Sequence, residues 1–275
     1  MNRFRVAVAA GALSVLAVGC QSEQTTQGGV VGIDRKQPMT SLVSAKEIEQ
    51  QASQEYAQIM AQAQKKGLLN QNPQYVQRVR TTAQRLIPHV GVFRPDALNW
   101  KWETNVLTSK DVNAWCMPGG KIAVYTGLIE RLDLTDAELA AVMGHEIAHA
   151  LREHARERIS RQMAAQTGTA IGAIALEIFT GIRIDPTLAG TVSQAAFVLP
   201  NSREAEQEAD RIGVELAARA GYDPRAAVTL WQKMAKLGGS APPQWLSTHP
   251  SNETRLQDLE VYTLKVMPLY RAAAR

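Results

Sequence analysis

Two histidines, His145 and His149, lie four residues apart in the pattern His-Glu-x-x-His. Thr135 and Glu138 form a capping box ahead of apolar residues at helical spacing, which predicts a helix over residues 135–151. Four residues of helix correspond to about 40° of rotation and about 6 Å of rise, so both imidazoles face one point. The pattern therefore predicts a zinc site.

Glu146 lies about 100° round this helix from His145. Its carboxylate can reach a water at the metal but is poorly placed to be a third ligand, so we predict that it is the general base. A chance match on a buried or solvated helix is the alternative. The apolar run from Leu139 to Met143 weighs against chance, because it places His145 at a buried end of the helix, where an unpaired imidazole is costly.

A hydrolytic zinc site needs a third protein ligand and keeps its fourth position for water. A second helix is predicted from Arg203 onward, with Asn201 or Ser202 as N-cap. Glu206 and Asp210 are four residues apart on one face of this helix. Glu206 is the candidate third ligand, and Asp210 is the candidate acceptor for the free ring N–H of a zinc histidine. Two further glutamates of this helix are expected on a solvated acidic face: Glu204 and Glu208.

Two more motifs flank these helices: Val112-Asn113-Ala114-Trp115 with Pro118-Gly119-Gly120 before the first, and Ser247-Thr248-His249-Pro250 with Arg255 after the second. Together with His-Glu-x-x-His and the following Glu-x-x-x-Asp, they resemble the HtpX-like family of zinc metallopeptidases, which are gluzincins. The resemblance is to the periplasmic lipoprotein branch of the family and extends from about residue 30 to about residue 262.

This resemblance implies one Zn2+ per chain, bound by His145, His149 and Glu206, with Glu146 as catalytic base and Asp210 behind the ligands. The implied reaction is peptide-bond hydrolysis, in which zinc polarises the scissile carbonyl and acidifies water. Substrates implied by the family are misfolded or misassembled periplasmic or outer-membrane proteins. A chaperone or assembly factor with a mainly structural zinc, acting with envelope assembly machinery, is the rival function.

The expected fold is α+β and mainly α-helical, with a zincin-like core in which the His-Glu-x-x-His helix lies against a small antiparallel sheet. Alternating apolar residues predict the first strand over 100–106; the others are expected over 111–116 and 121–126. The exposed edge carrying Asn113 and Ala114 is the candidate substrate-binding strand, to which an extended peptide adds. A purely structural border is the alternative.

His249 and Arg255 are catalytic candidates, because zinc peptidases need a donor for the carbonyl oxygen as it becomes an oxyanion. Alternatively, His249 closes the fourth zinc position in a latent state, or it is an ordinary loop residue before Pro250. These alternatives remain open on the sequence alone.

The first residues, 1–19, combine two arginines with an apolar run and no acid, which predicts a secretory signal peptide. The run ends in a sequence that resembles a bacterial lipobox, with Cys20 as the lipidated residue, although Leu16 is one position further from it than usual. Residues 20–40 are expected to be a flexible tether, and residues 41–275 the peptidase domain. Because residue 21 is not aspartate, the family pattern implies a periplasmic protein anchored in the inner leaflet of the outer membrane.

The formal charge of +4 falls to about +2 when Arg3 and Arg5 leave with the signal peptide, so no nucleic-acid partner is expected. Cys116, between Trp115 and Met117, is expected to be buried. The apolar stretch 167–181 is too short for a transmembrane helix, and core packing is its expected role; covering the active site or contacting the membrane or a partner is the alternative.

Further helices are predicted over 44–66, 72–87, 185–199 and 223–237. His154 is nine residues beyond His145, about 180° round a continuous helix, so it is expected to face away from the metal. Charged residues from Arg152 to Arg161 are expected to form a solvated face.

Overall fold

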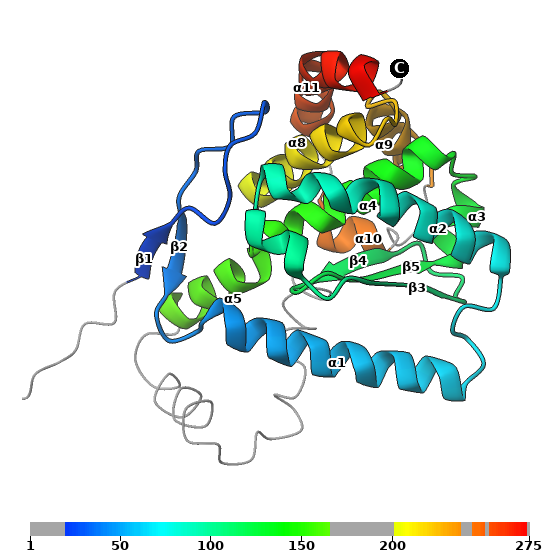
Figure 1. Ribbon diagram of the computed structural model, residues 1–275, viewed down its shortest axis with the longest axis horizontal. Helices are drawn as coiled ribbons and strands as arrows, with labels where there is room; N and C mark the ends of the chain where they lie inside the picture. The colour runs from blue at the N-terminus through cyan, green and yellow to red at the C-terminus, as the bar shows by residue number, and fades with distance from the viewer. Residues whose placement is uncertain (1–19, 166–200, 238–243, 251–252, 274–275) are drawn as a thin grey trace, which may run out of the picture.

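The computed structural model describes residues 20–165, 201–237, 244–250 and 253–273 (Figure 1). Helices pack on a small mixed sheet, and a separate hairpin lies at one side (Figure 1). This is the mainly helical α+β fold that the sequence predicts. In chain order the elements are β1 (Cys20–Glu23), β2 (Gln37–Thr40), α1 (Ala45–Lys65), α2 (Pro73–Leu86), η1 (Ile87–Val92), η2 (Pro95–Asn99), β3 (Glu103–Leu107), β4 (Ala114–Met117), β5 (Lys121–Tyr125), α3 (Thr126–Arg131), α4 (Asp136–Leu151), α5 (His154–Ala165), α8 (Arg203–Arg219), α9 (Ala226–Lys236), α10 (Gln244–Thr248) and α11 (Glu253–Ala273).

Capping side chains fix the starts of three helices where the sequence predicts them. At α4, Thr135 Oγ1 accepts a hydrogen bond from Glu138 N at 3.2 Å, while the Glu138 carboxylate accepts one from Thr135 N at 2.9 Å. Ser44 and Glu47 make the same reciprocal pair at α1, and Asn72 caps α2. Because capping sets the start of α4, it also sets the face on which the two histidines emerge.

The sheet separates two hydrophobic clusters, with α1 on one face and α2 and α4 on the other. Along β5, Ile122 and Val124 belong to the larger cluster, which contains the core of α4. Ala123, between them, belongs to the cluster that contains residues of α1 and α5. This alternation follows from the two-residue period of a strand. The helix α4 is therefore enclosed between the sheet and α8.

The strand order is β3-β5-β4, and the sheet is mixed rather than antiparallel. β4 and β5 form the predicted antiparallel hairpin, with Gly119 and Gly120 in its turn at φ 78° and 80°. β3 instead pairs in parallel with β5. The loop over 108–113 carries the chain past the central position, so β4 forms the outer edge and β5 returns between its neighbours. Residue periodicity identifies strands but carries no information on this order, so the prediction of an antiparallel sheet is wrong.

Residues 20–40 differ from the predicted flexible tether. β1 pairs with β2 in an antiparallel hairpin that places Cys20 opposite Thr40. Arg35 then forms ion pairs with Glu157 of α5 and Glu208 of α8, at 2.7 and 2.6 Å. Buried Val31 and Ile33 add apolar contacts with the main core, and composition does not reveal either kind of contact.

Cys116 is buried in β4, as predicted, and burial raises the pKa of its thiol well above the usual value. Within the described ranges, no helix combines the length and apolar character needed to cross a membrane. Three predicted segments lie outside the described residues: 1–19, 167–181 and 185–199.

The helices α4 and α8 touch backbone to backbone. A Cβ on Gly144 would lie 2.8 Å from the carbonyl oxygen of Gly213, and a Cβ on Gly213 would lie 2.8 Å from the backbone nitrogen of His145. Neither neighbour is a flexible side-chain end, so an added methyl requires one helix to move. The two glycines therefore set the separation of the helices that carry the predicted metal ligands.

We expect Gly213→Ala to lower the free energy of unfolding by about 1–2 kcal/mol, because an overpacking cost of about 1–3 kcal/mol exceeds the gain of about 1 kcal/mol from higher helix propensity. Denaturant unfolding of the metal-free protein measures this. Gln84→Ala, on the exposed side of α2, is the control and should change little. Equal or higher stability of Gly213→Ala would contradict the close contact.

Candidate metal centre

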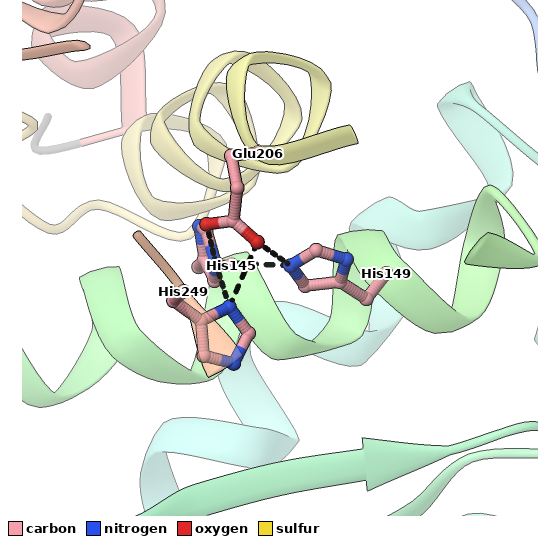
Figure 2. Close-up of side chains that lie close together, drawn as sticks. All are labelled: His145, His149, Glu206 and His249. Carbon is pink, nitrogen blue, oxygen red and sulfur yellow. Dashed lines mark hydrogen bonds and ion pairs between the residues drawn. The ribbon is translucent and has the colours of Figure 1, made fainter. Parts of the chain in front are cut away.

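Four side chains from three parts of the chain converge: His145 and His149 from α4, Glu206 from α8, and His249 directly after α10 (Figure 2). One potential ligand atom of each lies within 4.8 Å of the others. All four side chains are almost completely buried. The structure thus unites the three predicted ligands and adds His249 to them.

The distances from the two histidines to Glu206 suit a tetrahedral zinc ion, whereas the two histidine nitrogens lie closer together than such an ion would hold them. His145 Nε2 lies 3.0 Å from His149 Nε2, and the two nitrogens lie 3.5 and 3.4 Å from oxygens of Glu206. Zinc bonds of about 2.0–2.2 Å at tetrahedral angles place ligand atoms about 3.3–3.5 Å apart. Glu206 Oε2 forms an ion pair with Arg255 Nη1 at 2.7 Å, which orients the carboxylate toward the two histidines. The residues therefore fit one zinc ion.

Asp210 supports the first ligand. Its Oδ1 lies 2.9 Å from His145 Nδ1, which is the contact predicted from the helical spacing of Glu206 and Asp210. With Nδ1 carrying the proton, Nε2 keeps its lone pair on the metal side. Arg255 holds the same carboxylate from behind, through two hydrogen bonds of 2.8 Å.

Burial and neighbouring charges shift the pKa values of the ligands in different directions. Burial lowers the pKa of His145, but Asp210 and Glu206 outweigh this and raise it to about 9. Burial places the pKa of His149 well below its ordinary value. It would raise the pKa of Glu206, yet the neighbouring His249 and Arg255 hold that pKa well below the usual range. Metal binding must therefore displace a proton from His145, so zinc uptake is coupled to proton release.

Glu146 lies beside the four residues of the metal centre but is not one of them. Trp245 Nε1 donates a hydrogen bond to Glu146 Oε1 at 2.7 Å, and His249 Nε2 is 3.5 Å from the same oxygen. Trp245 also stacks on His249, with ring centroids 4.8 Å apart. Trp245 is a further residue of the site that the motifs do not predict, although its position four residues before His249 is a usable signal.

His249 lies at the fourth corner of the site. Its Nδ1 is 3.2 Å from His145 Nε2 and 3.0 Å from Glu206 Oε1. Asn201 Nδ2 lies 3.3 Å from the same nitrogen. This corner is the one that a catalytic zinc site keeps for water. The arrangement favours the predicted latching role of His249 over the oxyanion role.

Arg255 is 2% exposed, and its guanidinium contacts Asp210, Glu206 and the Pro250 carbonyl oxygen. These contacts direct its charge at two carboxylates of the metal centre. They favour a role in positioning these carboxylates over the predicted role as an oxyanion donor.

Asn113 and Ala114 differ from the predicted exposed edge. β4 is an edge strand of its sheet, but Asn113 and Ala114 are only 6% and 2% exposed as whole residues. Both residues face protein because the strand lies between α4 and α1. The prediction of an exposed edge is therefore wrong, because backbone and side chains are both covered here.

Two predictions are wrong: that Glu208 lies on a solvated acidic face, and that the charged residues from Arg152 onward are exposed to solvent. Glu208 is 5% exposed and Arg152 is fully buried, and the two form an ion pair. Burial raises the pKa of Glu208, but hydrogen bonds from His154 and Arg35 outweigh it and lower the pKa to about 2. Glu204 is exposed, as predicted. Helical spacing identifies a charged face but not the segment that covers it.

The donor set places the chain in the class of zinc metallopeptidases, because two histidines one helical turn apart and a glutamate from a second helix are a ligand set of these enzymes. Peptidase family M48 matches residues 73–263, and the chain belongs to this family. The HtpX-like resemblance is therefore confirmed at the level of the M48 family.

Relatives come from mitochondria and bacteria. The chain is 45% identical over 154 residues to the mitochondrial metalloendopeptidase OMA1 of Arabidopsis thaliana, covering 56% of this chain and 30% of that protein. It is 32% identical over 213 residues to the OMA1 of Schizosaccharomyces pombe, with coverages of 76% and 59%. It is 28% identical over 207 residues to the beta-barrel assembly-enhancing protease of Escherichia coli, with coverages of 72% and 41%. The chain thus spans less than two thirds of these relatives.

We expect about one zinc per chain, and we expect His145→Ala, His149→Ala or Glu206→Ala to remove most of it. Asp210→Ala should weaken zinc binding by about 10- to 100-fold without abolishing it. Metal analysis after dialysis and chelator competition measure both effects. Glu204→Ala, exposed on the same helix, is the matched control. Full zinc occupancy in Glu206→Ala would overturn its assignment as a ligand.

Proposed function

We propose that the chain is a zinc-dependent endopeptidase. The observation that carries this proposal is the position of Glu146 beside a site that already has three protein ligands. A structural zinc needs four ligands but no adjacent base. Here the carboxylate of Glu146 is held by Trp245, and the fourth corner is held by His249, which belongs to a separate short segment. The site thus has the base that hydrolysis requires, and displacement of His249 would give it the open fourth position.

The proposed reaction is hydrolysis of a peptide bond. Bound zinc supplies Lewis-acid polarisation of the scissile carbonyl and acidifies water. Glu146 accepts a proton from the water as its oxygen bonds to the carbonyl carbon. The same residue then delivers that proton to the amine nitrogen as the C–N bond breaks. Asp210 keeps the proton of His145 on Nδ1, away from the metal, and Arg255 holds Asp210 in place.

We propose that the substrates are misfolded or misassembled envelope proteins, bound as extended chains. Two observations support this. β4 is an edge strand of its sheet beside α4, the position at which an extended peptide adds as a further strand, and the proposal requires its buried residues to become accessible. One bacterial relative is named a beta-barrel assembly-enhancing protease. Envelope assembly machinery is accordingly a proposed partner, and the chaperone function remains the rival for the same substrates.

The proposed location is the periplasm, with a lipid anchor on Cys20 in the inner leaflet of the outer membrane. The sequence over 1–20 supports this through its signal-peptide and lipobox pattern. Since Cys20 begins β1, which pairs directly with β2, an anchor there would hold the domain close to the lipid surface. This lipoprotein branch of the family is part of the proposal.

We expect Glu146→Gln to retain zinc and fold while its cleavage of unfolded casein falls by at least about 100-fold, because the amide matches the carboxylate in shape but cannot accept the proton. Glu204→Gln is the matched control for the same chemical change at an exposed site. Cleavage by Glu146→Gln at the unmodified rate would refute the proposed base. Loss of cleavage together with full rescue of envelope integrity in a deletion strain would favour the chaperone function.

We expect His249→Ala to raise basal proteolysis with zinc content unchanged, because removal of the imidazole opens the fourth corner to water. If His249 instead donates to the oxyanion, the same change lowers kcat by about 10²- to 10³-fold. Casein digestion under saturating zinc distinguishes the two roles by sign. His89→Ala, in η1, is the control for loss of a histidine elsewhere. Unaltered activity would assign His249 to scaffolding.

A further inference from the structure

His154 lies against the second metal ligand, on the side away from the metal. The helix α4 ends at Leu151, Glu153 adopts a left-handed conformation with φ 52°, and α5 begins at His154. This sharp corner replaces the continuous helix expected from the sequence. It brings His154 Nδ1 to 2.7 Å from His149 Nδ1, with the ring of His154 2% exposed. The prediction that His154 points away from the metal centre is therefore wrong, because its ring contacts the far side of the ligand His149. His154 itself is not a ligand.

The geometry fixes the direction of this hydrogen bond. His149 Nε2 points into the metal site, 3.0 Å from His145 Nε2 and 3.4 Å from Glu206 Oε1. A metal there requires the lone pair of His149 Nε2, so the ring proton must be on Nδ1. His149 Nδ1 is then the donor, and His154 Nδ1 must accept.

The proton of the neutral His154 ring is then on Nε2, and this N–H has an acceptor. His154 Nε2 lies 3.1 Å from Glu208 Oε2. Arg152 Nε donates to the same oxygen at 2.9 Å, and Arg35 donates to both oxygens of Glu208, at 2.6 and 2.9 Å. In the series of hydrogen bonds from His149 through His154 to Glu208, each donor therefore meets an acceptor. Two arginines hold the Glu208 carboxylate at its end. One of them, Arg35, comes from the N-terminal hairpin, outside the matched family region.

The two zinc histidines are thus supported in parallel ways. His145 donates directly to Asp210, which Arg255 holds. His149 has no carboxylate within reach of its Nδ1 among its described contacts, and His154 extends the connection to Glu208. A histidine that serves only packing would need neither matched tautomers nor a carboxylate on its far nitrogen.

We propose that His154 is a positioning residue of the zinc centre, which accepts the Nδ1 proton of His149, fixes that ligand in the metal-binding tautomer and connects it through Glu208 to Arg35. The proposal concerns metal binding and stands whether or not the chain cleaves peptides.

Three substitutions separate the hydrogen bonds from packing. His154→Asn keeps an acceptor near the position of Nδ1. His154→Gln places its amide near the position of Nε2, and His154→Phe keeps the ring shape without either bond. We expect zinc affinity, measured by chelator competition, to fall by about 10- to 100-fold in the Phe and Gln variants and to stay close to the unmodified value in Asn. The visible spectrum of the cobalt-substituted protein should change in the same two variants. His89→Phe is the matched control.

Unchanged zinc affinity and an unchanged cobalt spectrum in His154→Phe would overturn the proposal and leave a packing role, which affects unfolding alone. A second measurement needs no variant and so remains decisive if these substitutions prevent folding. Long-range proton–nitrogen NMR of the zinc-loaded chain reports the tautomer of each histidine. We expect a protonated Nδ1 on His149 and a protonated Nε2 with unprotonated Nδ1 on His154. The reverse tautomer of His154, or a doubly protonated ring, would refute the direction of the bond.

Discussion

Gly144 and Gly213 bring the backbones of α4 and α8 into direct contact, and the geometry of the metal centre depends on this contact. Helices separated by larger side chains pack about 8–10 Å apart. A glutamate has a short reach, so Glu206 closes on two histidines of α4 only if its own helix lies close to them. The same approach brings Asp210, one turn further along α8, to the far nitrogen of His145. The close approach of the two helices thus determines the positions of both the ligand Glu206 and Asp210, which supports the ligand His145.

Buried charge is the second condition, because α8 holds four buried carboxylates and three of them pair with arginines from outside that helix. Each of the three has a specific cationic partner: Arg255 pairs with Glu206 and Asp210, whereas Arg35 and Arg152 pair with Glu208. Uncompensated, these carboxylates would cost several kcal/mol each on burial. The partners come from α11, from the corner after α4 and from the N-terminal hairpin, so segments distant in sequence stabilise opposite faces of one helix.

The sequence was informative where geometry is local. Helical spacing alone predicts that His145 and His149 converge, and capping residues predict where α4 begins. What could not be predicted depends on tertiary placement. The corner at Glu153 brings His154 against the ligand His149, on the side away from the metal, and the hairpin that carries Arg35 covers Glu208. Strand order within the sheet and the contact of Trp245 with Glu146 likewise depend on how separate segments pack.

The burial of Cys116 has a consequence for the selectivity of the metal centre. Thiolate sulfur is a preferred zinc ligand, and a free cysteine near such a site could displace a histidine or oxidise. Cys116 is enclosed within β4, and burial holds the pKa of its thiol far above neutral values. As a protonated thiol it is a poor ligand and a poor nucleophile. Cys116, the one cysteine of residues 41–275, therefore does not compete for the metal. A bound zinc would keep its nitrogen and oxygen ligands, with which it is a strong Lewis acid.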